Sequence, residues 1–288
     1  MTNLKRRSWL RHSGGMLTAA LMPCAASAQQ AVRRQLRFSI VLSNPHPSEL
    51  RDQQLWLYLP ASESPIQQID SVSVSAKHNM LSDALGHNIL QLSFTRIAPL
   101  ATKVVSIAVD VLLHDASEPA PLKDFRDWLT TERYIETSDA HIQALAAQLR
   151  QPTAQSSGRA IYEWLRQNMH YAGYIADDLG ALYAVTQRSG DCTEYAYLAV
   201  ALARANGIPA RMVGGYVTDR NIAPRAEDYH NWAELHIDGA WRLLDAQKEH
   251  WLTPAQQYIA FRFYRDKITN PVGLAHRFHS NGELQIRL

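Results

Sequence analysis

The segment GDCTEYAYLAVALARANG, residues 190–207, begins with polar residues and continues as a run rich in alanine and leucine. Alanine and leucine favour a helix, Gly207 suits the left-handed residue that ends one, and Pro209 prevents its continuation. We therefore expect a helix that ends near residue 206 and carries Cys192 in its first turn.

A cysteine at the start of a helix has a distinct electrostatic environment. Backbone N–H groups and the positive end of the helix dipole favour a thiolate, and they lower the thiol pKa from about 8.5. An ionised Asp191 would oppose this effect, so a protonated histidine nearby would have to supply the larger contribution. The structural alternative for Cys192 is a buried, unreactive thiol, which is common in proteins.

Two segments of alternating polarity flank Asp238-Gly239, which is a strong signal for a two-residue hairpin turn. With that turn Trp232 lies opposite Asp245. His230 and Asp245 then become diagonal neighbours on one face, about 7–8 Å apart at the backbone, whereas a one-residue slip would move Asp245 to the other face. The pattern predicts a triad in which the Asp245 carboxylate orients the His230 ring beside Cys192.

These residues carry a family resemblance. The chain resembles the transglutaminase-like superfamily of papain-type folds over about residues 155–250, through GDCTEYA (190–196), ARANGIPAR (203–211), HNWAE (230–234) and WRLLD (241–245). The resemblance implies that Cys192 is a nucleophile, His230 a general base and acid, and Asp245 the orienting carboxylate. It also implies a β-rich domain ahead of the catalytic one. Activity does not follow from it, because some members of the superfamily have lost catalysis.

The first half of the chain has the pattern of strands. Residues 33–113 alternate in polarity and are divided by turn signals, which predicts an antiparallel β-sandwich at 31–115. Helical patterns follow at 138–150 and 157–169. We expect an α+β fold: the sandwich as an accessory domain, a helical linker at 116–155, a transglutaminase-like (papain-like) catalytic domain at 156–260, and a C-terminal extension at 261–288.

The first 28 residues have the pattern of a cleaved export signal. Basic residues 5–7 precede an apolar run, too short to span a membrane, and a small-residue cleavage pattern ends at Ala28. The basic stretch resembles a twin-arginine signal; the alternative is an ordinary secretory signal. Cleavage would remove Cys24 and leave Cys192 as the one cysteine. We expect a periplasmic or secreted protein.

Overall composition excludes some partners. The 288-residue chain is 46% hydrophobic and 19% charged, which is typical of globular proteins. Without residues 1–28, 25 basic and 27 acidic side chains remain. This balance gives no electrostatic argument for nucleic acid or an anionic membrane, and we expect no nucleic-acid partner. The short apolar run in residues 1–28 leads us to expect no membrane span.

Other candidate site residues are weaker. The backbone N–H of Cys192 is the natural first donor to an oxyanion, and Gln187 and Tyr171 are candidates for the second. Glu234 and His236 share the His230 face, but alternate spacing follows from any strand, so we expect no metal site and no cofactor.

The leading hypothesis is a cysteine-dependent acyl-transfer enzyme that acts on peptide or side-chain amides through a thioester on Cys192. Water would make it a peptidase, amidase or deamidase, and an amine would make it a transglutaminase-type ligase. Hydrolysis is slightly favoured, because nothing marks an amine site. The alternative is a catalytically silent, periplasmic peptide-binding or assembly protein, whose sandwich could dock a protein partner.

Overall fold

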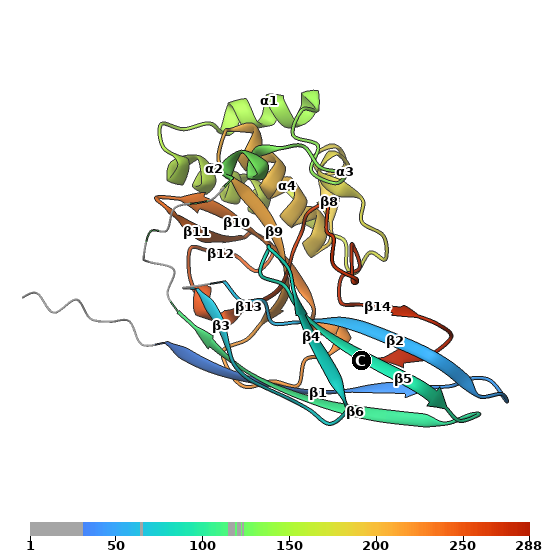
Figure 1. Ribbon diagram of the computed structural model, residues 1–288. Helices are drawn as coiled ribbons and strands as arrows, with labels where there is room; N and C mark the ends of the chain where they lie inside the picture. The colour runs from blue at the N-terminus through green and yellow to red at the C-terminus, as the bar shows by residue number, and fades with distance from the viewer. Residues whose placement is uncertain (1–30, 64–65, 115–118, 120–121, 123) are drawn as a thin grey trace, which may run out of the picture.

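The computed structural model describes residues 31–63, 66–114, 119, 122 and 124–288 (Figure 1). The expected export signal and part of the start of the expected 116–155 linker lie outside these residues. Among the described residues, the helices are all too short or too polar to cross a bilayer.

The N-terminal region forms a β-sandwich of two antiparallel sheets, as expected. One sheet has the order β15-β1-β6-β3 and the other β14-β2-β5-β4. The alternating residues place their apolar side chains between the sheets, where Leu36, Ile40, Leu55 and Val109 are fully buried. The sandwich strands are β1 (Val32–Ser43), β2 (Leu50–Leu59), β3 (Gln67–Val74), β4 (His78–Ser82), β5 (Asn88–Ile97), β6 (Thr102–Leu113), β14 (Phe278–Asn281) and β15 (Gln285–Arg287).

The C-terminal residues do not form a separate extension. β14 pairs with β2 and β15 pairs with β1, so the last residues add one edge strand to each sheet of the sandwich. The boundary expected at residue 260 falls inside β13 (Tyr258–Phe263), which pairs with β9. These strands could not be placed from sequence because β14 and β15 are only four and three residues long.

The second domain is built on an antiparallel sheet with the order β12-β11-β10-β9-β13. Its central helix is α4, which has ten side chains with under 5% exposure among residues 194–204. Besides β13, the helices and strands of this domain are α1 (Ala140–Leu149), α2 (Ala154–Asn168), β7 (His170–Tyr171), α3 (Gly180–Gln187), β8 (Ser189–Gly190), α4 (Cys192–Ala205), β9 (Ala210–Val217), β10 (His230–Ile237), β11 (Ala240–Asp245) and β12 (His250–Trp251). Short 3₁₀ helices span Phe125–Leu129, Ala226–Asp228 and Ala255–Gln257.

Helix α1 belongs to this second domain and not to a linker. Its residues Ile142, Leu145 and Ala146 lie in the same apolar cluster as α4. Asp139 caps α1, accepting a hydrogen bond from the backbone N–H of His141 at 2.8 Å. The helical segment expected at 116–155 therefore differs from the structure, because α1 buries its apolar face against α4.

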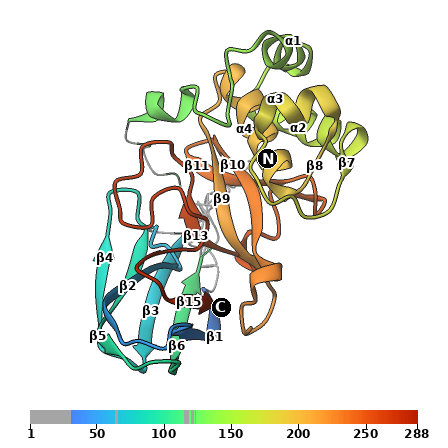
Figure 2. The same ribbon diagram turned by 90° about the vertical axis from the view of Figure 1, so that its right-hand side faces the viewer.

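The five-stranded sheet lies between the helices and the sandwich (Figures 1 and 2). Its β10 and β11 residues Ala233, Leu235 and Leu244 pack in the cluster of α4. On the other face, Tyr216 and Phe261 pack in the cluster of the sandwich. Two separate cores thus share one sheet, which fixes the position of the domains relative to each other.

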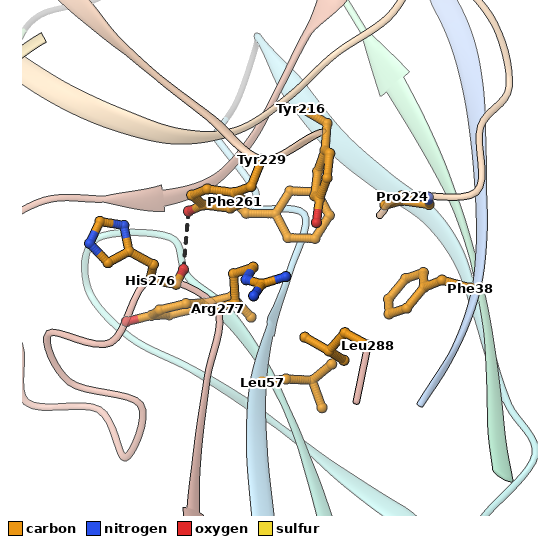
Figure 3. A pocket seen from close by; sticks show the side chains of 10 residues that line it. Phe38, Leu57, Tyr216, Pro224, Tyr229, Phe261, His276, Arg277 and Leu288 are labelled. Atoms are coloured by element: carbon orange, nitrogen blue, oxygen red, sulfur yellow. Dashed lines mark hydrogen bonds between the residues drawn. The ribbon is translucent and has the colours of Figure 1, made fainter. Parts of the chain in front are cut away.

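A small cavity of about 30 Å³ marks this domain interface. Figure 3 shows Phe38 and Leu57 of the sandwich facing Tyr216 and Phe261 of the sheet, with Arg277 among the rings. The hydroxyl of Tyr229 closes one side by donating to the backbone oxygen of His276 at 3.0 Å.

The loop that connects β9 to β10, residues 218–229, is attached to the sandwich. Ile222 forms a parallel bridge with Leu36 of β1. The backbone N–H of Arg37 donates to the oxygen of Ile222 at 3.0 Å, and Ile222 donates to the oxygen of Gln35 at 3.1 Å. Asn221 accepts a further bond from the backbone of Gln35 through its side chain, at 2.9 Å. The sandwich therefore fixes the middle of this loop.

Candidate active site

Cys192 is the first residue of α4, and the turn before it is fixed by a capping box. The Asp191 side chain accepts from the backbone N–H of Thr193 at 2.7 Å. In return, the backbone N–H of Asp191 donates to the Glu194 carboxyl at 3.1 Å. These bonds satisfy helix N–H groups that would otherwise lack partners. The expected helix and its cap are confirmed, including the left-handed Gly207 with φ 79°.

The surroundings of the Cys192 thiol work against ionisation. Burial raises its pKa to about 12, and the charge of Asp191 adds to the rise. The backbone N–H of Asn231 and the hydroxyl of Thr193 bond to the sulfur and lower the pKa, but by less. The helix terminus is therefore not sufficient to make a thiolate, and a cation beside the sulfur is needed.

His230 and Asp245 face each other across the hairpin. The strands pair with Ile237 opposite Ala240 and Ala233 opposite Leu244, which is the expected register. The Nε2–H of His230 donates to Oδ2 of Asp245 at 2.6 Å. A carboxylate can only accept, so the imidazole carries its proton on Nε2, and Nδ1 is the ring nitrogen left for another partner.

Asp245 is held as a carboxylate. Burial alone would raise its pKa, but the hydrogen bond and charge of His230 outweigh this and hold the pKa below its ordinary value. The hydroxyl of Tyr258 donates to Oδ2 at 2.7 Å and the backbone N–H of Lys248 donates to Oδ1 at 3.0 Å. The carboxylate can therefore stabilise an imidazolium in a site from which water is largely excluded.

The start of β10 is joined to the start of α4. Besides the backbone bond of Asn231 to the sulfur, the Asn231 side chain donates to the hydroxyl of Thr193 at 3.0 Å. His230 precedes Asn231 in the chain, so these contacts hold the imidazole at the same end of the helix as Cys192. Trp232 stacks on the His230 ring, with centroids 6.3 Å apart and planes 21° apart.

Cys192 and His230 line one cleft with a volume of about 450 Å³. Tyr171 lies in the same lining. Most of the remaining lining comes from residues 216–229, and Gln247 and Lys248 complete it. This volume falls within the range of small-molecule and peptide side-chain sites.

The two candidate oxyanion donors lie in different places. Tyr171 lines the cleft, and its pKa is raised by burial and by the nearby Cys192. Gln187 is the last residue of α3, is exposed, and is not among the residues that line the cleft. The chain turns at Arg188, in a left-handed conformation with φ 51°, before it reaches β8. This leaves Tyr171 as the candidate with access to Cys192.

Glu234 and His236 serve other contacts. The Glu234 carboxylate accepts from Arg211 at 2.8 Å and from the indole N–H of Trp232 at 3.2 Å. The His236 ring packs edge-on against Trp241, with centroids 5.2 Å apart. Within the described part of the chain, no group of three or more His, Cys, Asp or Glu side chains could hold a metal ion.

Three residues of the site were not identified from sequence. Asn231 adjoins His230, so its place in the motif was the available signal. Tyr258 and His250 approach Asp245 from β13 and β12, and no local pattern marks them. The strand β13 reaches the site by pairing with β9, which lies some 40 residues earlier in the chain.

The chain is similar to a known family of domains and to several solved structures. Residues 143–246 match the model of the transglutaminase-like superfamily. A structure from Cytophaga hutchinsonii, described as a "Putative Cysteine Protease", has a TM-score of 0.59 and 22% identity over 88% of this chain and 92% of that chain. No curated protein sequence matches the chain.

Two further structures have lower similarity. The periplasmic domain of TgpA from Pseudomonas aeruginosa has a TM-score of 0.40 and 17% identity over 77% of this chain and 88% of that chain. Red sea bream transglutaminase has a TM-score of 0.29 and 13% identity over 78% of this chain and 50% of that chain.

At 22% identity, the likeness to the Cytophaga hutchinsonii structure shows a shared α+β fold, which in this chain places a β-rich region ahead of a helix-covered sheet. Residues 143–246 form a domain of the transglutaminase-like superfamily. The resemblance drawn from the four sequence motifs is thereby confirmed.

Proposed function

We propose that the protein is a cysteine-dependent acyl-transfer enzyme that acts on peptide or side-chain amides. The observation that carries the proposal is the 2.6 Å bond from His230 to Asp245, made beside a cleft that both His230 and Cys192 line. The cleft can hold an extended peptide segment or a long side chain next to the sulfur.

In the first half-reaction, Nδ1 of His230 takes the proton of the Cys192 thiol, and the thiolate attacks the amide carbonyl carbon. Asp245 stabilises the resulting imidazolium. The backbone N–H of Cys192 and the hydroxyl of Tyr171 donate to the oxyanion. The C–N bond then breaks, His230 returns its proton to the departing amine, and a thioester remains on Cys192.

In the second half-reaction, water or an amine attacks the thioester and His230 accepts its proton. The C–S bond breaks, and the thiolate leaves and regains a proton from His230. Water gives a peptidase, amidase or deamidase, and an amine gives an amide ligase. Hydrolysis is slightly favoured, because water is abundant and needs no dedicated site.

A binding protein without catalysis is the second candidate. It is favoured by one observation, the Cys192 pKa raised to about 12 by burial and by Asp191. In that case the cleft would hold a peptide without cleaving it. Replacement of Cys192 by alanine would then leave peptide binding and the cellular phenotype intact.

The experiment that tests the enzyme proposal is alkylation of Cys192 by iodoacetamide at pH 7, followed by mass spectrometry of its peptide. We expect rapid alkylation, slowed by about 10-fold or more in His230→Ala, because the variant lacks the cation that stabilises the thiolate. His236→Ala on the same strand is the matched control and should react like the wild type. A thiol that stays unreactive in the native protein would contradict the proposal.

We also propose that the chain is exported to the periplasm or secreted. The support is the basic and apolar pattern of residues 1–28 and the small-residue cleavage pattern that ends it. N-terminal sequencing of the protein from the periplasmic fraction should give a start near Gln29.

A further inference from the structure

The hydrogen-bond network of His230 and Asp245 continues beyond the carboxylate to two more residues. Tyr258, the first residue of β13, donates its hydroxyl proton to Oδ2 of Asp245 at 2.7 Å. The hydroxyl oxygen of Tyr258 in turn lies 2.7 Å from Nδ1 of His250, on β12. Asp245 on β11 is thus bonded by His230 of β10 and by Tyr258 of β13, and His250 of β12 bonds Tyr258.

The direction of each hydrogen bond follows from the chemistry of the groups. Both His230 and Tyr258 must donate to Oδ2, because an ionised carboxylate has no proton to give. Burial and the charge of Asp245 raise the pKa of Tyr258, so its hydroxyl keeps its proton. That proton is already directed at Asp245, so Nδ1 of His250 must carry the proton of the last bond.

Tyr258 has no direct access to a substrate. Its side chain is 6% exposed, and it is not among the residues that line the cleft. Its ring packs edge-on against Trp232, with centroids 5.0 Å apart, and Trp232 stacks on His230. Any effect of Tyr258 on Cys192 therefore passes through Asp245 and His230.

We propose that Tyr258 is a positioning residue for the reaction, and that His250 supports it by fixing the direction of its hydroxyl. Tyr258 holds Oδ2 of Asp245 in place, and the carboxylate in turn holds the His230 ring with Nδ1 available to Cys192. The inference rests on the proposed function, because it assigns Tyr258 a role in the reactivity of the same thiol.

The test is a double-mutant cycle on the alkylation rate of Cys192 by iodoacetamide in the full chain. Tyr258→Phe removes the hydroxyl alone, and we expect alkylation to slow by about 10-fold, as for loss of a hydrogen bond to a charged group. In the His230→Ala background the same change should alter the rate by less than about 2-fold, because the path to the sulfur is already broken.

A purely structural role for Tyr258 gives a different result. It would slow alkylation by the same factor in both backgrounds, and that outcome overturns the proposal, as does an unchanged rate in the single variant. Tyr264→Phe is the matched control, since Tyr264 follows β13 and donates to Asp266 at 2.6 Å, away from the triad. It should leave the rate unchanged.

His250 provides a second test that does not depend on the folding of Tyr258→Phe. His250→Gln keeps an N–H donor and His250→Leu does not, so we expect the glutamine variant to react faster than the leucine variant, by about 3-fold. Equal rates would contradict the role of His250.

If Cys192 reacts slowly in the wild type and independently of His230, the proposed function itself fails, which is a different outcome from failure of the Tyr258 cycle.

Discussion

The Cys192 sulfur experiences opposing influences within a few ångströms. Burial and the Asp191 carboxylate favour the neutral thiol, whereas Asn231, Thr193 and the helix terminus favour the thiolate. The helix cap that positions Cys192 thus also places a negative charge beside it. An imidazolium at His230 would reverse this balance in favour of the thiolate. The Asp245 carboxylate would stabilise that imidazolium.

Replacement of Asp245 by asparagine tests this balance. The side-chain size is kept, but the amide is neutral and can turn its NH₂ group toward Nε2 of His230, which then loses its proton. We expect turnover or single-turnover acylation to fall by about 10²–10⁴-fold. A drop of less than about 3-fold would contradict the role of Asp245.

At this scale the sequence predicts the acid–base residues better than their surroundings. The sequence predicts that Cys192, His230 and Asp245 lie together, because each is in a motif with helix or hairpin signals close by in the chain. Tyr258 gives no such signal, because its contact with Asp245 depends on the order of strands in the sheet, and His250 enters the network only through Tyr258. Gln187 precedes Cys192 by only five residues, but this closeness in the chain does not bring it into the cleft, because the chain turns at Arg188 in between.

Among the elements, α4 depends on a carboxyl pair at its start. Glu194 is fully buried, accepts from the backbone N–H groups of Leu179 and Asp191 at 3.0 and 3.1 Å, and lies beside the Asp191 carboxylate. Burial raises its pKa to about 7. Glu194 therefore holds its proton in the folded protein at pH values where an unfolded chain has lost it.

This predicts a pH-dependent contribution to stability. Between about pH 4.5 and 7 the folded state binds more protons at Glu194 than the unfolded state, so stability from this group is lost as pH rises. The wild type should be more stable than Glu194→Gln at pH 5, and the difference should shrink at pH 8. Urea unfolding midpoints at the two pH values measure it, and a difference that does not change with pH would contradict the assignment.

The elements themselves were predictable to different degrees. The β10–β11 hairpin was placed in the correct register because Asp238-Gly239 specifies a two-residue turn, whose left-handed residues the structure contains. The sequence does not place β14 and β15, since they are short and pair with strands that lie more than 200 residues earlier in the chain. The helical pattern expected at 138–150 corresponds to α1, which begins at Ala140 after its N-cap Asp139.

At the scale of the molecule, the sandwich contributes to the cleft. Residues 218–229 form much of the cleft lining, and the middle of this loop is bonded to the backbone of β1. The first half of β1 lies at a sheet edge, where its free N–H and C=O groups are available to Ile222. The shape of the cleft wall thus depends on a strand of the other domain.

Arg37→Pro should loosen this wall, because proline removes the N–H that donates to Ile222. We expect alkylation of Cys192 by iodoacetamide to stay within about 2-fold of the wild-type rate, since the small reagent needs only the triad. A peptidyl chloromethyl ketone, which must occupy the cleft, should react several-fold more slowly.

The matched control is Arg37→Ala, which removes the side chain and keeps the backbone donor. It should behave like the wild type with both reagents. Equal slowing of the two reagents by Arg37→Pro would point to a general loss of structure and would contradict a role confined to the cleft wall.

The return of β14 and β15 to the two sheets of the sandwich has a consequence for biosynthesis. The N-terminal domain is a discontinuous unit into which the whole helical domain is inserted, so a nascent chain lacks two strands of the sandwich until residues 278–287 have been synthesised. A chain truncated just before β14 would therefore keep Cys192, His230 and Asp245 but would leave the sandwich without an edge strand in each sheet.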